Sequence, residues 1–162
     1  RKWKAEGRPT EDGPAAKRSE RHYTPLQNTE IIRDLEEMKA LIKKSGAQIV
    51  DARPAGRFEG RDAEPRAGLR KGHIPGSRNI PSQNLLTPDG TLKPAEDLAA
   101  LFKAANIDVT RPVVTTCGSG VTASMLALAL AVLGQTNAAV YDGSWAEWGA
   151  DNSLPIETGP AS

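Results

Sequence analysis

The sequence predicts an α/β domain whose central sheet is mostly parallel and is covered by helices on both faces. Segments with helical and extended patterns alternate along the chain in the order helix, strand, loop, strand, helix, strand, helix, strand. The clearest unit is a β-branched strand, Val113–Thr116, which runs through a glycine-containing loop into the apolar segment 123–133. Ligands of such folds bind at the carboxyl ends of the strands, which is where this loop lies.

Composition excludes several classes of protein. The 162 residues carry 21 basic and 20 acidic side chains, so nothing indicates binding to nucleic acid or to a membrane surface. The longest apolar run is shorter than the ~20 residues that span a bilayer, which predicts a soluble protein. One cysteine excludes an internal disulfide, and two histidines disfavour a zinc site. We expect no metal and no cofactor, and a reducing compartment: the cytoplasm, or the mitochondrion in a eukaryote.

The chain divides into an arm, a folded domain and a tail. Residues 1–24 are polar and rich in charge, glycine and proline, which is typical of a linker or arm. Within this arm, Trp3 either packs on its own domain or docks on a domain that this chain lacks. The chain begins with Arg1 rather than Met and shows no secretory signal, which suggests a piece of a longer protein. We assign residues 25–158 to the folded domain and 159–162 to the tail.

The first helix and strand of this domain are predicted from apolar spacing. A helix is expected over 28–45, capped by Asn28 or Thr29 and ended by Gly46. Its apolar face would consist of Ile31, Ile32, Leu35, Met38, Leu41 and Ile42. The strand 48–53 follows, and Asp51 and Arg53 point to the same side of it. We interpret them as a structural ion pair rather than as catalytic groups.

A long irregular stretch, 54–71, carries Arg57, Arg61, Arg66 and Arg70. Loops of this length are usually functional or disordered, and arginine suits bidentate binding of carboxylates, but composition alone favours a solvated charged loop. The turn-rich segment 72–81 then leads into a brief strand, 78–80. His73 in this segment could act as a base; we interpret it instead as ordering a turn.

The second half of the chain alternates more regularly. Pro94 starts a helix that ends near Asn106 and buries Leu98, Leu101 and Phe102. After the strand and helix around the cysteine, Gly134 ends the helix and a last strand covers 138–141. The residues after Asp151 are expected to be loose.

Cys117, the first residue of the loop after Val113–Thr116, is the strongest functional candidate. Its loop leads into a helix N-terminus, where the helix dipole and unpaired N–H groups favour thiolate over thiol. The thiolate is the reactive form of cysteine. A cysteine can also be a small buried hydrophobe, but Gly118 and Gly120 give this loop more backbone freedom than a plain turn needs.

Three chemistries are compatible with a cysteine in such a loop. Phosphoryl transfer needs an arginine at the end of the loop, where this chain has Ala123. Acyl transfer needs a histidine base, and neither His22 nor His73 comes with a recognisable partner. Sulfur transfer needs only a thiolate that can carry an extra sulfur, and N–H groups that stabilise the anionic persulfide. The residues present favour this third chemistry.

Four motifs together resemble the rhodanese family over residues 25–158, which implies a rhodanese-like domain. They are Asp51-Ala52-Arg53, Gly72-His73-Ile74-Pro75-Gly76, Cys117-Gly118-Ser119-Gly120-Val121-Thr122-Ala123 and Asp142-Gly143-Ser144-Trp145. The uncharged Gly118 and Ser119 resemble the loop of 3-mercaptopyruvate sulfurtransferases. Thiosulfate sulfurtransferases have basic residues at these two positions.

The resemblance implies a role for each candidate residue. Cys117 would be the nucleophile and persulfide carrier, and Ser119 would orient or help deprotonate the substrate thiol. Arg57 and Arg66 would bind the carboxylate and carbonyl oxygens of the substrate. The remaining loop residues would supply N–H groups to the site; they are Gly118, Gly120, Val121 and Thr122.

The resemblance also implies a two-domain protein whose active site lies between the domains, in the second one. Residues 1–24 would then be the end of a missing N-terminal rhodanese domain and the linker that follows it. The expected activity moves the sulfur of 3-mercaptopyruvate through Cys117 to cyanide or to a thiol such as thioredoxin, and releases pyruvate. The alternatives are a thiosulfate sulfurtransferase and a non-catalytic module that binds a partner through its arginine loop.

Overall fold

A computed structural model describes residues 2–26, 28–44 and 46–161. Within these residues the core is a five-stranded sheet in the order β1-β5-β4-β2-β3, and every strand pair is parallel. The strands are β1 (Ile32–Arg33), β2 (Gln48–Asp51), β3 (Arg78–Asn79), β4 (Val113–Thr116) and β5 (Ala139–Tyr141). The predicted parallel α/β sheet is confirmed, and β4, which precedes Cys117, is its central strand.

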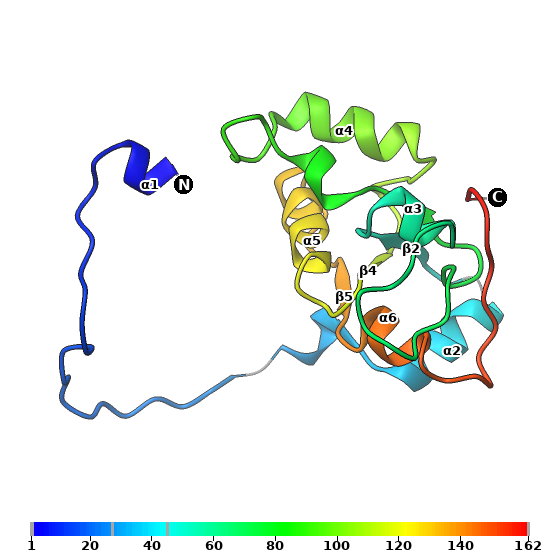
Figure 1. The fold of residues 1–162 in the computed structure, drawn as a ribbon, viewed down its shortest axis with the longest axis horizontal. Helices are drawn as coiled ribbons and strands as arrows, with labels where there is room; N and C mark the ends of the chain where they lie inside the picture. Colours follow the sequence, from blue (N-terminus) through cyan, green and yellow to red (C-terminus); the bar gives the residue numbers. More distant parts are fainter. Residues whose placement is uncertain (1, 27, 45, 162) are drawn as a thin grey trace.

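Helices cover both faces of the sheet, as expected (Figure 1). The α-helices are α1 (Lys2–Ala5), α2 (Leu35–Lys44), α3 (Ala55–Phe58), α4 (Ala95–Ala104), α5 (Ala123–Val132) and α6 (Ser144–Trp148). Two short 3-10 helices are η1 (Thr29–Ile31) and η2 (Ser82–Leu85). Helices α4 and α5 pack on one face and α2 and α6 on the other. None of the described helices is long and apolar enough to cross a bilayer.

Alternating side chains of the strands feed two separate apolar cores, as strand geometry requires. Val50 and Val113 point to the core shared with α4 and α5. Their neighbours Ile49 and Val114 point to the core shared with α2 and α6. Cys117 belongs to the first core, so its loop begins on the α5 side of the sheet.

The expected helix over 28–45 is wrong in its first part. Asn28 caps only η1, through a 3.0 Å bond from the Glu30 N–H to its side chain, and Ile32 then pairs with β5 as part of β1. Helix α2 begins after Asp34, because Asp34 and Glu37 form a reciprocal capping box with two 2.9 Å hydrogen bonds. The expected end at Ser45 lies outside the described residues.

The other long helices and the remaining strands agree with the sequence, whereas the short helices α1 and α6 were not predicted. Helix α4 follows Pro94 and ends before Asn106, whose φ of 56° is left-handed. Strands β3 and β5 lie within the predicted ranges. Helix α3, inside the stretch expected to be irregular, and η2 were not predicted. Both are about one turn long, which is too short for an apolar repeat to be visible.

The stretch after Asp151, expected to be loose, is instead held against the domain: Glu157 pairs with His73, and Leu154 is buried.

The N-terminal arm is extended and exposed, and Figure 1 shows it leaving the domain beside η1. Trp3 packs within the arm: its indole donates a 2.9 Å hydrogen bond to the Pro9 carbonyl, and Arg8 lies over its ring. At its far end, Lys2 comes within 3.8 Å of Asp89 in the domain. The extended conformation agrees with the predicted arm, while its proposed origin in a preceding domain stays a prediction.

Candidate active site

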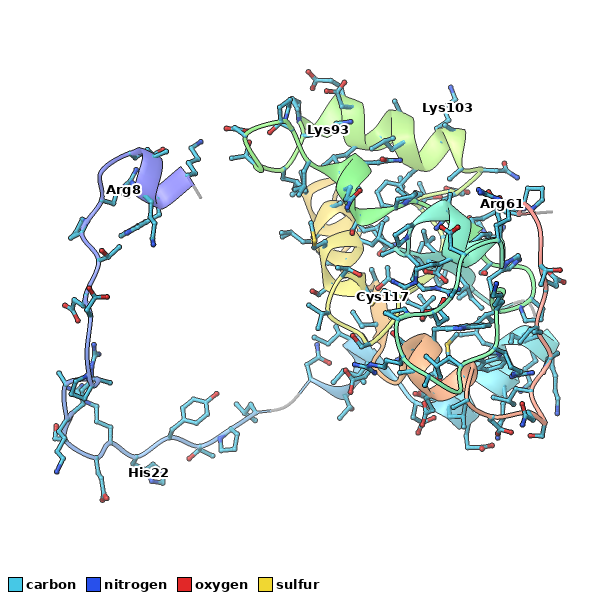
Figure 2. The ribbon with its side chains drawn as sticks, viewed as in Figure 1. Arg8, His22, Arg61, Lys93, Lys103 and Cys117 are labelled. Carbon is cyan, nitrogen blue, oxygen red and sulfur yellow. The ribbon has the colours of Figure 1, made fainter. Side chains whose placement is uncertain are left out.

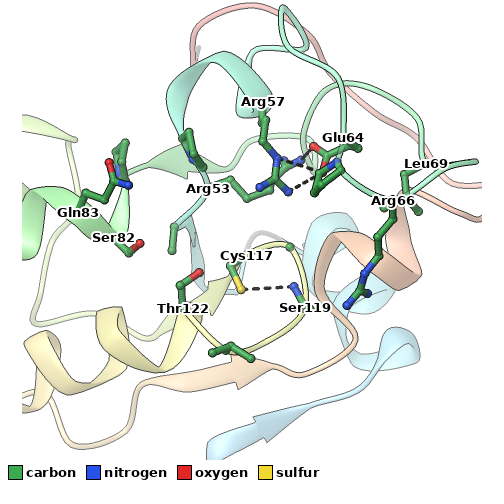
Figure 3. Close-up of a pocket in the computed structure, with 16 residues that line it drawn as sticks. Arg53, Arg57, Glu64, Arg66, Leu69, Ser82, Gln83, Cys117, Ser119 and Thr122 are labelled. Atoms are coloured by element: carbon green, nitrogen blue, oxygen red, sulfur yellow. Dashed lines mark hydrogen bonds and ion pairs between the residues drawn. The ribbon is translucent and has the colours of Figure 1, made fainter. Parts of the chain in front are cut away.

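Cys117 lies directly after β4, at the carboxyl edge of the sheet, and is buried at the base of a cavity of about 370 Å³ (Figure 3). The cavity walls come from the cysteine loop, the segment from β2 through α3 to residue 69, and the start of η2. Strand–loop–helix geometry therefore brings a reactive side chain to the edge where ligands bind in this class of fold.

Helix α6 holds the backbone of the cysteine loop. The N–H groups of Trp145 and Ala146 donate to the carbonyls of Cys117 and Gly118 at 2.9 and 3.0 Å. The buried Ser144 hydroxyl accepts the N–H groups of Cys117 and Gly120 at 3.2 and 3.0 Å, and donates to the Tyr141 carbonyl. In the sequence, Ser144 stands out only as part of the Asp142-Gly143-Ser144-Trp145 motif. Its role as the anchor of the loop was missed.

Four polar groups near the sulfur act on it: the Thr122 hydroxyl and the N–H groups of Ser119, Thr122 and Ala123. The Ser119 N–H donates to Cys117 Sγ at 3.5 Å. Burial raises the pKa of the Cys117 thiol, but the Thr122 hydroxyl and the N–H groups of Ser119, Ala123 and Thr122 outweigh burial and lower the pKa below its ordinary value. The loop therefore favours the thiolate, as its position before α5 indicates.

The set of N–H groups around the sulfur differs from the expected one. Thr122 contributes as expected, whereas the Gly120 N–H, expected in the cradle, donates to Ser144 instead. Gly120 has a φ of 81°, and a Cβ there would lie 2.9 Å from the Asp142 carbonyl oxygen. A glycine is therefore needed at position 120, because the loop makes a left-handed turn there in close contact with the segment before α6. Gly118 and Val121 line the cavity, and Val121 is exposed at its mouth.

Arg57, on α3, lies against the cysteine loop. Its guanidinium approaches so closely that a Cβ on Gly118 would be 3.1 Å from Arg57 Nη2. The Glu64 carboxylate fixes this orientation by accepting from Arg57 Nη2 at 2.5 Å and from Nε at 3.2 Å. Gly118 therefore leaves room for a cation against the cysteine loop.

The four arginines of segment 54–71 have different environments. Arg57 and the exposed Arg66 line the cavity, and Figure 3 shows Arg66 extending on the Ser119 side of the loop. Arg70 donates to four carbonyls in and after α6, whereas Arg61 forms an exposed ion pair with Glu59. The expected solvated loop describes Arg61 but not Arg70. Seven of the eight expected site residues line the cavity, and the exception is Gly120.

A buried ionic network supports Arg57 from behind. Arg53 is fully buried and pairs with Asp51 at 2.7 Å and with Glu64 at 2.8 Å, which confirms the expected Asp51–Arg53 pair. Its guanidinium also lies 4.3 Å from the centre of the Trp145 ring. Glu64 was missed as a site residue, because Glu59 and Asp62 are also acidic side chains in this arginine-rich segment and the sequence does not distinguish the three.

Neither histidine reaches the cavity. His73 is buried, stacks on Phe58 with ring centres 3.8 Å apart, and bonds through Nδ1 to the Phe58 carbonyl at 2.8 Å, so its expected turn-ordering role is confirmed. Figure 2 shows His22 on the extended arm, away from Cys117. Across the described residues, no three His, Cys, Asp or Glu side chains are grouped as metal ligands.

A parallel α/β domain with a thiolate-favouring cysteine in the loop after its central strand is the arrangement expected of a rhodanese-like protein. Comparison with known families agrees: residues 34–151 match the rhodanese-like domain. The chain belongs to the rhodanese family.

Individual relatives are similar over most of this chain. The 3-mercaptopyruvate sulfurtransferase of Escherichia coli K12 is 40% identical over 155 residues, which are 96% of this chain and 54% of that protein. The thiosulfate sulfurtransferase of Bos taurus is 40% identical over 149 residues, or 91% of this chain and 50% of that protein. The crystal structure of SseA from Escherichia coli, a 3-mercaptopyruvate sulfotransferase, superposes with a TM-score of 0.74 at 36% identity, over 88% of this chain and 52% of that one. The chain thus spans about half the length of these relatives.

Proposed function

We propose that this chain is the catalytic half of a 3-mercaptopyruvate sulfurtransferase. The observation that carries the proposal is the placement of Arg57 and Arg66 around a cavity whose base is a thiolate-favouring Cys117. Guanidinium groups suit the carboxylate and carbonyl oxygens of a 2-oxo acid, and the thiolate suits attack on its sulfur. The proposal is also supported by the similarity to proteins of this name.

In the first half-reaction, the Cys117 thiolate attacks the sulfur of 3-mercaptopyruvate and forms an S–S bond. The C–S bond of the substrate breaks, and its electron pair passes to the methylene carbon as the pyruvate enolate. This carbon takes up the proton that the substrate thiol loses. The products are pyruvate and the Cys117 persulfide anion.

The loop supports both steps of this transfer. The N–H groups of Ser119, Thr122 and Ala123, which lower the pKa of Cys117, are available to the negative charge of the persulfide. Ser119 is exposed in the cavity wall, where its hydroxyl orients the substrate thiol and assists its deprotonation. Arg57, held by Glu64, binds the carboxylate end of the substrate.

In the second half-reaction, an acceptor attacks the outer sulfur of the persulfide and regenerates the Cys117 thiolate. Cyanide would leave as thiocyanate, and a thiol would leave as a persulfide. We propose a protein thiol such as thioredoxin as the acceptor. Its access would be through the mouth of the cavity beside the exposed Val121.

The domain organisation is part of the same proposal. We assign residues 25–158 to the catalytic domain, 159–162 to its tail, and 1–24 to the linker and the end of an N-terminal rhodanese domain. In support, Leu128 and Val132, one turn apart on α5, form an exposed apolar patch, with exposed fractions of 56% and 49%. We propose that the N-terminal domain covers this patch.

A thiosulfate sulfurtransferase is the second candidate, since a protein of that name is as similar as the bacterial mercaptopyruvate enzyme. Both donors would load the same cysteine. The uncharged Gly118 and Ser119 favour 3-mercaptopyruvate, because thiosulfate carries two negative charges and this loop adds no cation to meet them. Comparing kcat/KM for the two donors separates the candidates.

The test is sulfur transfer from 3-mercaptopyruvate to cyanide by the wild-type chain, Cys117→Ser and Arg57→Ala. We expect Cys117→Ser to abolish transfer, and Arg57→Ala to raise KM by about 10–100-fold through loss of a charged hydrogen bond of ~1.5–3 kcal/mol. Arg61→Ala, which removes an exposed arginine of the same segment, is the matched control and should leave KM unchanged. Transfer by Cys117→Ser at the wild-type rate would refute the proposal.

A further inference from the structure

Glu64 is a buried carboxylate in the wall of a cavity otherwise rich in positive charge. Its side chain is 1% exposed, and each of its oxygens accepts from a different arginine. Oε1 takes Arg53 Nη1 at 2.8 Å, and Oε2 takes Arg57 Nη2 at 2.5 Å. Glu64 therefore sets both the position of Arg57 and the net charge around the sulfur.

The charged side chains that line the cavity, together with the Asp51 carboxylate paired to Arg53, nearly balance. Three guanidinium groups, from Arg53, Arg57 and Arg66, face two carboxylates, from Asp51 and Glu64. One net positive charge remains, and the Cys117 thiolate cancels it. Each donor is therefore added to a cavity whose own charges largely cancel, and a donor with more negative charge meets less compensation.

We infer that Glu64 is a specificity-determining residue that restricts the site to sulfur donors carrying a single negative charge. The inference rests on the proposed function and deepens it. Mercaptopyruvate with a neutral thiol carries one negative charge, on its carboxylate. Thiosulfate carries two, next to the sulfur that the thiolate must attack. Charges that lie close together in a partly buried site interact more strongly than charges in bulk water, so one extra negative charge separates the two donors.

Glu64→Gln tests this inference, since the amide keeps the shape of the side chain and an oxygen acceptor but removes the negative charge. We expect the ratio of Cys117 loading rates, thiosulfate over 3-mercaptopyruvate, to rise by about tenfold or more. Both rates are measured on one protein sample by the intact mass of the persulfide. The ratio is therefore independent of the fraction of folded protein.

Two control variants separate charge from position and from surface effects. Glu64→Asp keeps the charge but withdraws the carboxylate from Arg57, so both loading rates should fall and their ratio should stay within twofold of wild type. Glu59→Gln removes an exposed acid of the same segment, paired with Arg61, and should change neither rate. A donor ratio that shifts equally in Glu64→Asp and Glu64→Gln would show that position, not charge, acts.

A second readout needs no sulfur transfer. Cys117 is the only cysteine, so its alkylation by iodoacetate and by neutral iodoacetamide can be followed by mass. Both reagents consume the same thiolate, and their rate ratio reports the local charge. We expect Glu64→Gln to raise the iodoacetate-to-iodoacetamide ratio severalfold. Removing the Glu64 charge leaves Arg53 and Arg57 short of a partner and destabilises the fold. The Glu64→Gln/Arg57→Gln variant removes one negative and one positive charge together. Its iodoacetate-to-iodoacetamide ratio should therefore return to that of wild type.

The outcomes distinguish this inference from the proposed function. If neither donor loads wild-type Cys117 but the alkylation ratio shifts, the proposed function fails and the electrostatic role of Glu64 stands. If both donors load Cys117 but neither ratio changes by more than twofold in Glu64→Gln, the inference is overturned and the proposed function stands. An unchanged alkylation ratio overturns the inference in every case.

Discussion

Cys117 is surrounded by polar groups that come from distant parts of the chain, and each changes what the sulfur can do. Thr122 and the loop N–H groups lower its pKa, Ser144 fixes the backbone that carries these groups, and Glu64 holds Arg57 beside the loop. The reactivity of Cys117 therefore depends on the hydrogen bonds to its sulfur and not on the residue type alone.

Thr122→Val should make Cys117 less reactive near neutral pH. The substitution removes a hydroxyl that lowers the pKa of Cys117, so the pKa should rise and the thiolate fraction at pH 7 should fall. We expect alkylation by iodoacetamide to slow by roughly threefold to tenfold, the equivalent of one hydrogen bond of about 0.5–1.5 kcal/mol. The pH profile of alkylation should move to higher pH. Thr122→Ser keeps the hydroxyl and should match wild type; equal profiles for all three proteins would contradict this account.

The role of some site residues can be predicted from the sequence, whereas the role of others depends on the folded structure. Cys117 is recognisable because strand, glycines and helix follow one another within a few residues. Glu64 is not, since its partners Arg53 and Arg57 lie 11 and 7 positions away and meet it only after the segment folds back. The direction of the Gly120 N–H depends on its left-handed φ, which residue type permits but does not dictate.

Among the elements, α2 shows how a local cap can override an apolar repeat. Ile31 and Ile32 continue the helical spacing, yet the reciprocal bonds of Asp34 and Glu37 start the helix after them. The isoleucines then form η1 and the edge strand β1. Spacing therefore predicted the buried face of α2 but not where it begins, whereas α4 and α5, with breakers at Pro94 and Gly134, were placed well.

Asp34→Ala should destabilise the domain by about 0.5–2 kcal/mol, the usual effect of losing an N-cap side chain. Asn28→Ala should have a smaller effect, because the Asn28 side chain caps only the exposed η1. Urea denaturation of both variants checks this order. A larger loss for Asn28→Ala would indicate that the helix begins where the apolar repeat does.

For the whole molecule, the arm and the domain behave as separate parts. Among the described residues, the ion pair between Lys2 and Asp89 joins the far end of the arm to the domain, and exposed pairs of this kind contribute about 0–1 kcal/mol. The two cores and the cavity use residues beyond position 34. The parallel sheet was predictable because alternation of elements along the chain determines it.

A chain that begins at residue 25 should therefore unfold at nearly the same temperature as the full 162-residue chain. Calorimetry of the two proteins, with Cys117 alkylation rates as a check on the site, tests the assigned boundary. A fall in Tm of more than about 4 °C, the equivalent of ~1 kcal/mol in a domain of this size, would show that the arm belongs to the folded unit.

The central claim is that Cys117 accepts the sulfur of 3-mercaptopyruvate, and the most direct measurement is intact mass after a single turnover. The chain is mixed with 3-mercaptopyruvate in the absence of an acceptor, and pyruvate is quantified in the same sample. We predict an adduct of about 32 Da, located on Cys117, and one pyruvate released per adduct. Release of pyruvate without the adduct, or an adduct that persists in Cys117→Ser, would contradict the account.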